Sequence, residues 1–394
     1  MRTNDLTRWQ LEPPGFSAWV HTHGMDAALC VNNYRESVFA GTDHYRQEEF
    51  MRYHRGDGNC PGCPNNCIKL FAGEKSAAAT EARGMHQEIA GALGPNCGIA
   101  DLGAVMRANV LCNELGLDPT SLGFTLSMAM ECVERGTLSE RLRFGDADAM
   151  LEMIEDVAHR RGFGAVLSEG ARRASNQIGG EAARYALHVK GLEMVSFEPR
   201  TQTNLALGYA VAPVGPRYDI CEHDWDFDTT FGWDHTLELS RTIGILKRIP
   251  MNYLGADKVR NFKALLTIWS AADVLDFCIF AIAPTRVLTL EEMARMLAAV
   301  TGWKTSSYEI MRFGERRLHL MRLYNLREGL TAADGVLPAR FFDDPIPAGR
   351  WAGTRLDRAE FGAAVRTFYR MMGWDDEGRP REETLIDRHL GEFA

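Results

Sequence analysis

Three cysteines within eight residues most constrain how this chain can fold. Cys60, Cys63 and Cys67 form a C-x2-C-x3-C clip, with proline and glycine between them. Thiolates at this spacing can close around one iron–sulfur cube, and a loop that wraps a cube must turn tightly and aim backbone N–H groups at sulfur. The clip therefore predicts an iron–sulfur cluster and electron transfer. A structural zinc site and three unconnected buried thiols are the alternatives.

A cube needs four ligands, so the fourth must come from elsewhere in the sequence. The remaining cysteines are Cys30, Cys97, Cys112, Cys132, Cys221 and Cys278. Cys112 and Cys132 fall within helical apolar patterns, where burial alone explains them. Cys278 follows a predicted helix, where a thiolate can project from a turn, and Asp273 stands five residues before it. We predict Cys278 as the fourth ligand.

Composition excludes several function classes. The net charge of -9 on 394 residues argues against a nucleic-acid partner, which would require a basic face. Nine cysteines are too few for a disulfide scaffold in a chain of this length, and an odd number cannot pair completely. The N-terminus also lacks the apolar stretch of a signal peptide, so we expect a cytoplasmic protein. The most apolar region, 265–283, contains two aspartates and predicts a buried helix and turn rather than a membrane span.

Helical periodicity dominates, so the sequence predicts a mainly α, multihelical chain with two domains, 1–188 and 189–394. One apolar stripe with spacings of three and four consists of Val259, Phe262, Leu266 and Trp269, and a second predicted helix begins at a Thr289–Glu292 capping box and ends at Gly302. A third contains Met150, Ile154 and Val157 and ends at Gly162. Strand-like alternation is limited to pieces such as 185–189, and 342–353 is expected to be a surface connection.

Further motifs resemble the aldehyde:ferredoxin oxidoreductase family, specifically its second and third domains. They are the clip, Asp273-x-x-x-x-Cys278, Gly116-Leu117-Asp118-Pro119-Thr120-Ser121, Lys190-Gly191-Leu192-Glu193, Gly208-Tyr209-Ala210, Gly314-Glu315-Arg316, Arg322-Leu323-Tyr324-Asn325-Leu326-Arg327-Glu328-Gly329, Leu337-Pro338-Ala339-Arg340-Phe341 and Gly373-Trp374-Asp375. They span most of the chain in order. The resemblance implies the fold of the family's C-terminal domains.

The resemblance also implies cofactors and site residues. The family holds tungsten or molybdenum between two pyranopterins beside a [4Fe-4S] cluster, and oxidises aldehydes to carboxylic acids with electrons passed to ferredoxin. By this similarity Cys278 is the fourth cluster ligand, Asp273 and Phe277 belong to one pterin element, and Asp118 and Leu122 belong to the other. Taken alone, Asp118 would be a helix cap or turn former and Asp273 a turn residue. Glu88 aligns with a glutamate near the metal and could act as an acid or base, the alternative being a helix-surface residue.

Three departures qualify this similarity. The matching residues begin with the second domain, so we expect a separately encoded subunit to supply the family's N-terminal, β-rich pterin-binding domain. The family's catalytic histidine aligns with Tyr218, which leaves proton transfer to Glu88, Tyr218, Asp219 or a shifted His223. The glycine and leucine before the last cluster cysteine are Asp276 and Phe277 here.

The sequence thus predicts the catalytic subunit of a split tungsten- or molybdenum-pterin oxidoreductase that acts on an aldehyde or related carbonyl compound. The alternative is an iron–sulfur electron-transfer or assembly protein that kept the fold without the pterin metal centre. An acidic ferredoxin would require a basic patch, for which Lys258, Arg260 and Lys263 are candidates, unless they form a solvated helix face.

Overall fold

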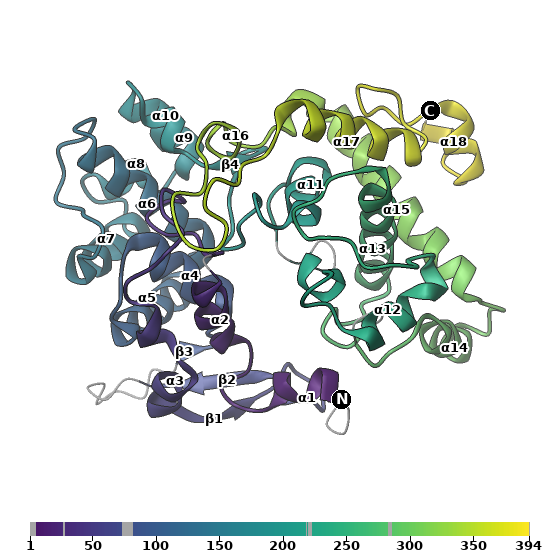
Figure 1. Cartoon of the computed structure of the whole chain (residues 1–394), viewed down its shortest axis with the longest axis horizontal. Coiled ribbons are helices and arrows are strands. Elements are labelled where there is room, and N and C mark those ends of the chain that lie inside the picture. Colours follow the sequence, from purple (N-terminus) through teal and green to yellow (C-terminus); the bar gives the residue numbers. More distant parts are fainter. Residues whose placement is uncertain are drawn as a thin grey trace. The chain divides into compact units, whose positions relative to one another are not determined.

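The computed structural model of the chain describes residues 5–26, 28–72, 82–217, 219, 223–282 and 286–393. The chain divides into two compact units. The clip unit comprises Trp9–Glu198 and Pro338–Arg355, and the C-terminal unit comprises Met1–Arg8, Pro199–Leu337 and Leu356–Ala394. Helices dominate both (Figure 1), which confirms the predicted mainly α, multihelical class. The domain boundary expected between residues 188 and 189 stays a prediction.

The clip unit packs its helices around one apolar core. Its longest helices are α5 (Leu102–Leu115), α6 (Pro119–Glu134) and α7 (Ala147–Ala158). The shorter ones are α2 (Trp19–Met25), α3 (Gln47–Tyr53), α4 (Gln87–Leu93), α8 (Gly164–Leu167), α9 (Ala171–Ile178), α10 (Ala182–Tyr185) and α16 (Arg340–Asp343). Gly123 lets α6 approach α4, because an added Cβ would lie 2.6 Å from the Ala92 carbonyl oxygen.

Two small antiparallel sheets complete the clip unit. Strands β1 (His54–Gly58), β2 (Ile68–Phe71) and β3 (Ala82–Arg83) are ordered β1-β2-β3, and Gly58 pairs with Ile68. Strands β4 (His188–Val189) and β5 (Leu192–Glu193) form a second pair. Of the strand expected over 185–189, only the last two residues pair as a strand, and Tyr185 is the last residue of α10.

A buried ion pair ties the segment Pro338–Arg355 to the rest of the clip unit. The Arg340 guanidinium contacts both carboxylate oxygens of Glu131 at 2.8 and 2.9 Å, and the Glu131 side chain is fully buried. Asn33 donates to the same carboxylate at 2.8 Å. The expected surface connection 342–353 is therefore partly wrong, because Phe342 and Ile346 are buried.

The C-terminal unit is built around α13 (Ala256–Val274) and α15 (Ser307–Arg327), which run side by side (Figure 1). An added Cβ at Gly314 would lie 2.1 Å from the Thr267 carbonyl oxygen, so glycine is required for this close approach. The other helices are α11 (Thr203–Val211), α12 (Asp234–Ser240), α14 (Leu290–Thr301), α17 (Arg358–Met371) and α18 (Glu382–Asp387). Helix α1 (Asp5–Leu11) includes residues of both units.

The helices predicted from periodicity are present. The stripe that includes Val259 lies on α13, and α14 has both hydrogen bonds of the Thr289–Glu292 capping box and ends at Gly302 with φ 75°. Helix α7 is also present, but it ends at Ala158 and not near Gly162, because Arg160 already has the left-handed φ of 51°. Across the described ranges, no single helix has the length and hydropathy needed to cross a membrane, although Gln87–Cys97 and Leu102–Leu115 meet that requirement as a pair bent by 119°.

The basic patch expected before Asp273 does not form. Lys258 is buried against the fully buried Asp224, and Lys263 pairs with Glu315 at 2.6 Å. Of the three cations, Arg260 is exposed and Lys263 is partly exposed. Both the ferredoxin patch and the solvated-face alternative were therefore wrong for Lys258, because the counter-ion Asp224 comes from a segment distant in sequence.

Candidate functional site

The three-cysteine clip forms the loop of the β1–β2 hairpin. The Cys63 N–H donates to the Cys60 carbonyl at 3.0 Å, and Gly62 has φ 76°. This is a type II turn, which favours Pro61 at its second position and requires glycine-like backbone at its third. The Asn65 N–H points at Cys63 Sγ at 3.5 Å, a bond of the kind that stabilises thiolates in clusters. The tight turn expected from the proline and glycine is confirmed.

A charged network lies at the base of the clip. Asp57 on β1 contacts Lys69 Nζ at 3.1 Å, His54 Nε2 at 3.0 Å and Asn66 Nδ2 at 2.7 Å. Partial burial raises the pKa of the Asp57 carboxyl, but the hydrogen bonds from His54, Lys69 and Asn66 lower it more, and the net pKa is below its usual value. Asp57 is therefore ionised at neutral pH.

Burial separates the remaining cysteines into two classes. Cys30, Cys97, Cys112 and Cys132 are buried, and desolvation raises the pKa of each thiol, for example to about 12 for Cys112 and about 11 for Cys132. A metal ligand must be a thiolate that can reach the metal, which these environments oppose. Cys278 is exposed, and Cys221 lies outside the described residues.

Cys278 follows a Schellman turn at the end of α13. The Phe277 N–H donates to the Ala272 carbonyl at 2.9 Å, and the Asp276 N–H donates to the Asp273 carbonyl at 3.4 Å. Asp276 has φ 56°, the left-handed conformation that glycine commonly adopts at this position after a helix. The substitution for glycine noted in the sequence thus retains a glycine-like backbone.

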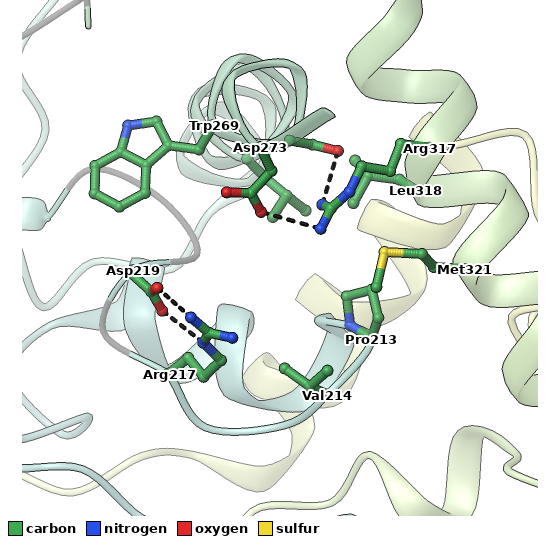
Figure 2. A pocket seen from close by; sticks show the side chains of 11 residues that line it. Pro213, Val214, Arg217, Asp219, Trp269, Asp273, Arg317, Leu318 and Met321 are labelled. Atoms are coloured by element: carbon green, nitrogen blue, oxygen red, sulfur yellow. Dashed lines mark hydrogen bonds and ion pairs between the residues drawn. The ribbon is translucent and has the colours of Figure 1, made fainter. Parts of the chain in front are cut away.

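Asp273 lines a small pocket in the C-terminal unit, with a volume of about 60 Å³ (Figure 2). Its carboxylate pairs with Arg317 Nη2 at 3.0 Å, and the Arg317 guanidinium also donates to Ser270 Oγ at 3.3 Å. A second ion pair lines the same pocket: Arg217 Nε donates to Asp219 Oδ1 at 2.7 Å. Burial raises the pKa of Asp273, Arg317 opposes this and Asp219 adds to it, so the net pKa is raised.

Asp118 caps the first turn of α6. Its Oδ1 atom accepts the Ser121 N–H at 2.7 Å, and Pro119 occupies the first helical position. The capping role that Asp118 would have as a lone residue is therefore real. Leu122 directs its side chain into the core of the clip unit and is 6% exposed.

Glu88 is buried near the start of α4 rather than on a helix surface, so the surface alternative was wrong. One of its carboxylate oxygens accepts the Ser196 N–H at 2.8 Å, and Ser196 Oγ donates to the Glu88 carbonyl at 2.9 Å. His223 is partly exposed and precedes the buried Asp224. Tyr218 lies outside the described residues.

The predicted site residues are divided between the two units. The clip, Glu88, Asp118 and Leu122 belong to the clip unit, whereas His223, Asp273, Phe277 and Cys278 belong to the C-terminal unit. Within the ranges that the structure describes, no group of three or more His, Cys, Asp or Glu side chains is arranged to hold a metal ion. The donor set of the clip nevertheless fits an iron–sulfur cluster, because three thiols stand in one hairpin loop and an N–H is aimed at the sulfur of Cys63. The shared four-sulfur site stays a prediction.

Comparison with known proteins establishes the family. Residues 1–390 match the family described as aldehyde ferredoxin oxidoreductase, domains 2 and 3. This chain belongs to the aldehyde ferredoxin oxidoreductase family. Similar proteins include the tungsten-containing aldehyde ferredoxin oxidoreductases of Pyrococcus furiosus, 28% identical over all of this chain and 62% of that protein, and of Thermococcus kodakarensis, 29% identical over the same shares. The chain thus spans about 60% of the length of these relatives.

Two further proteins that are similar to this chain are a subunit and a complex. The WOR-like subunit of the aliphatic sulfonate oxidoreductase of Pyrococcus furiosus is 26% identical over 84% of this chain and 50% of that protein. The active-site complex BamBC of benzoyl coenzyme A reductase, solved with 1,5-dienoyl-CoA, contains a chain with a TM-score of 0.74 and 19% identity, covering 96% of this chain and 60% of that one. The latter supports the fold alone.

Sequence reasoning missed several charged residues of this family member. Lys69, Arg217 and Arg317 were not identified from the sequence as site residues. Lys69 contacts Asp57 at the base of the clip, whereas Arg217 and Arg317 contact Asp219 and Asp273 in the pocket of the C-terminal unit. No periodic pattern marks them. Lys69 stands between Ile68 and Leu70 in a strand, and only its register shows that it faces the interior.

Proposed function

We propose that this chain is the cluster-bearing catalytic subunit of a tungsten- or molybdenum-pterin oxidoreductase that acts on an aldehyde or a related carbonyl compound. The observation that carries this proposal is the division of the cysteines by burial. The clip thiols lie in one hairpin loop and Cys278 is exposed after a helix, whereas the other described cysteines are buried. Membership of the family supports the proposal.

The residues that would hold the cofactors are few. Cys60, Cys63, Cys67 and Cys278 would supply the thiolates for a [4Fe-4S] cluster. Asp273 and Asp118 would accept hydrogen bonds from the N–H groups of the two pterins, since an ionised carboxylate can accept two such bonds at once. Phe277 and Leu122 would line the pterins beside these two aspartates with their backbone groups.

When bound, the pterin metal would supply two-electron chemistry for the substrate, and a cluster on the four cysteines would supply one-electron transfer to a ferredoxin or similar carrier. Residues of the chain must accept and donate the protons that the reaction transfers. Glu88 is our first candidate, because it is buried and its carboxylate is oriented by the Ser196 N–H at 2.8 Å. Tyr218, Asp219 and His223 are the other candidates in place of the family's histidine.

A partner subunit would carry a pterin-binding domain of the family's N-terminal type. Two of the similar proteins bear names that describe a subunit or a complex, the WOR-like subunit and BamBC. We propose the same division for this chain in a cytoplasmic enzyme. The cofactor would then be enclosed by two polypeptides, which excludes water from the metal.

One observation favours a second function, an iron–sulfur electron-transfer or assembly protein without the pterin metal. Both carboxylates assigned to pterin already have partners within the chain: Asp118 caps α6 and Asp273 pairs with Arg317 at 3.0 Å. A chain that had lost the pterin could keep these contacts and the cluster.

Metal analysis distinguishes these functions. The chain is purified without air, alone and co-expressed with a subunit of the N-terminal type. We expect iron in both preparations, and tungsten or molybdenum in the co-expressed preparation alone. Iron without tungsten or molybdenum in a stable complex would leave the electron-transfer function, and zinc without iron would refute both.

The fourth ligand has its own test. Cys278→Ser should abolish the spectroscopic signature of a four-iron cluster, and iron per chain should fall. Cys30→Ser is the matched control, because Cys30 is a buried cysteine whose hydrogen bond to the Gly91 carbonyl serine can replace. A Cys278→Ser spectrum identical to that of Cys30→Ser would place the fourth ligand elsewhere.

A further inference from the structure

The strand that leaves the clip carries a lysine on its buried face. Along β2, Lys69 and Phe71 are buried while Ile68 and Leu70 are partly exposed. Lysine is almost never fully buried unless it is paired, yet the Lys69 side chain is 3% exposed. An apolar residue would fill this position at no desolvation cost, so the charge itself requires an explanation.

The Lys69 ammonium is surrounded by oxygen atoms. It donates to the Leu11 carbonyl, to the Asn66 carbonyl at 2.9 Å and to Asp57 Oδ1 at 3.1 Å. Its aliphatic stem passes beneath Gly15, where an added Cβ would lie 3.4 Å from Lys69 Cε. Three acceptors saturate the three N–H bonds of an ammonium group, so every donor of Lys69 is satisfied, and one of the three acceptors carries a negative charge.

These contacts converge on the residue that precedes Cys67. Asn66 is held twice: its carbonyl accepts from Lys69, and its side-chain amide donates to Asp57 Oδ2 at 2.7 Å. Asp57 is itself anchored by His54 at 3.0 Å. At the other end of the loop, the Asn59 side chain donates to the Cys63 carbonyl. The loop is thus fixed at both ends by side chains that are not themselves ligands.

We propose that Lys69 and Asp57 are positioning residues for the iron–sulfur cluster, which hold the clip loop in place to bind it and set the cluster's reduction potential through their opposite charges. This inference rests on the proposed function, since it requires a cluster on the clip. A positive charge held in a buried site favours the more negative, reduced cluster and raises the potential; the Asp57 carboxylate, whose side chain is 24% exposed, has the opposite effect.

Because Lys69 and Asp57 carry opposite charges, removing one or the other should shift the reduction potential of the cluster in opposite directions. The cluster-loaded chain, with its partner where one is needed for folding, is compared with Lys69→Met, Asp57→Asn, the double variant and Arg55→Met. Arg55 is the matched control, because it is a surface cation on the same hairpin. The reduction potential is measured by spectroscopic titration, and cluster stability by the rate of iron loss to a chelator.

We expect Lys69→Met to shift the potential to more negative values and Asp57→Asn to shift it to more positive values. The double variant should return near the wild-type potential but keep a rate of iron loss raised by about tenfold, because the bonds from a charged donor to Asn66 are gone. Arg55→Met should change neither quantity, since its charge is solvated and screened.

Two results would overturn the inference. One is a potential in Lys69→Met and Asp57→Asn that matches Arg55→Met. The other is a shift of the same sign in both variants, which a purely structural disturbance would give. If Lys69→Met fails to fold, Asp57→Asn carries the test by itself. Absence of iron from the wild-type chain would instead refute the proposed function, so the two failures are distinguishable.

Discussion

The first turn of α6 and the last turn of α13 each hold an aspartate that resembles a pterin contact, but at opposite ends of a helix. At the N-terminus of α6, Asp118 accepts the Ser121 N–H at 2.7 Å, and the helix dipole favours its negative charge. Asp273 lies in the last turn of α13, where the helix dipole opposes its negative charge. Arg317 compensates at 3.0 Å.

This difference separates residues that the fold requires from residues that it merely tolerates. Asp118 would be favoured in any protein with a helix starting at Pro119, so its presence says little about a ligand. Asp273 is placed where a carboxylate does not help the helix, and burial raises its pKa. A residue kept against local preference is a better indicator of function than one that follows it.

The largest expected effect of replacing these aspartates is on the content of the pterin metal. In the complex with the N-terminal-type subunit, Asp273→Asn should lower tungsten or molybdenum content by about tenfold, since a neutral amide accepts fewer and weaker hydrogen bonds from pterin. Asp118→Asn should lower it less, because one Asp118 oxygen is already used by the cap. Metal content relative to iron is the measurement. Equal losses in both variants would mean that the two aspartates contribute equally to pterin binding.

The stability of α6 gives the next prediction. Asp118→Ala should lower the free energy of unfolding by about 1 kcal/mol, whereas Asp118→Asn should be nearly neutral, because asparagine is an equally good cap. Asp146→Ala is a matched control, since Asp146 caps α7 in the same way at 3.0 Å. Chemical denaturation measures all three. Should Asp118→Ala cost far less than Asp146→Ala, Asp118 would not owe its place to the cap.

Sequence reasoning assigned both aspartates to the pterins through the same family resemblance, and that assignment stays a prediction. The mainly α fold, the capping box of α14 and the turn of the clip follow from local rules, because each depends on residues a few positions apart. The partners of Asp273 and Lys258 do not, because Arg317 and Asp224 lie far away in sequence. Local patterns predict backbone, whereas charge compensation depends on tertiary packing.

The turn after Asp273 tests the same helix end without touching the carboxylate. Asp276 has φ 56°, where glycine is unstrained, so Asp276→Gly should stabilise the chain by up to about 1 kcal/mol. An opposite substitution at another left-handed helix end, Gly302→Asp at the C-cap of α14 with φ 75°, should destabilise the chain by a similar amount. Thermal unfolding measures both. If Asp276→Gly lowers the melting temperature, the Asp276 side chain has a role beyond the turn.

The smallest effect is the dependence of stability on pH at Asp273. Because its pKa in the folded chain is raised above the unfolded value of 3.8, the folded state binds more protons in the window that begins there, and stability falls as pH rises through it. Asp273→Asn removes this penalty, so the variant should unfold at a slightly higher temperature than wild type at pH 7, and the difference should disappear below pH about 4. Solvent screens a side chain that is 50% exposed, which keeps the gain small. A variant that is less stable at pH 7 would mean that the ion pair with Arg317 outweighs burial and the helix dipole, and would place Asp273 with Asp118 among the residues that the fold requires.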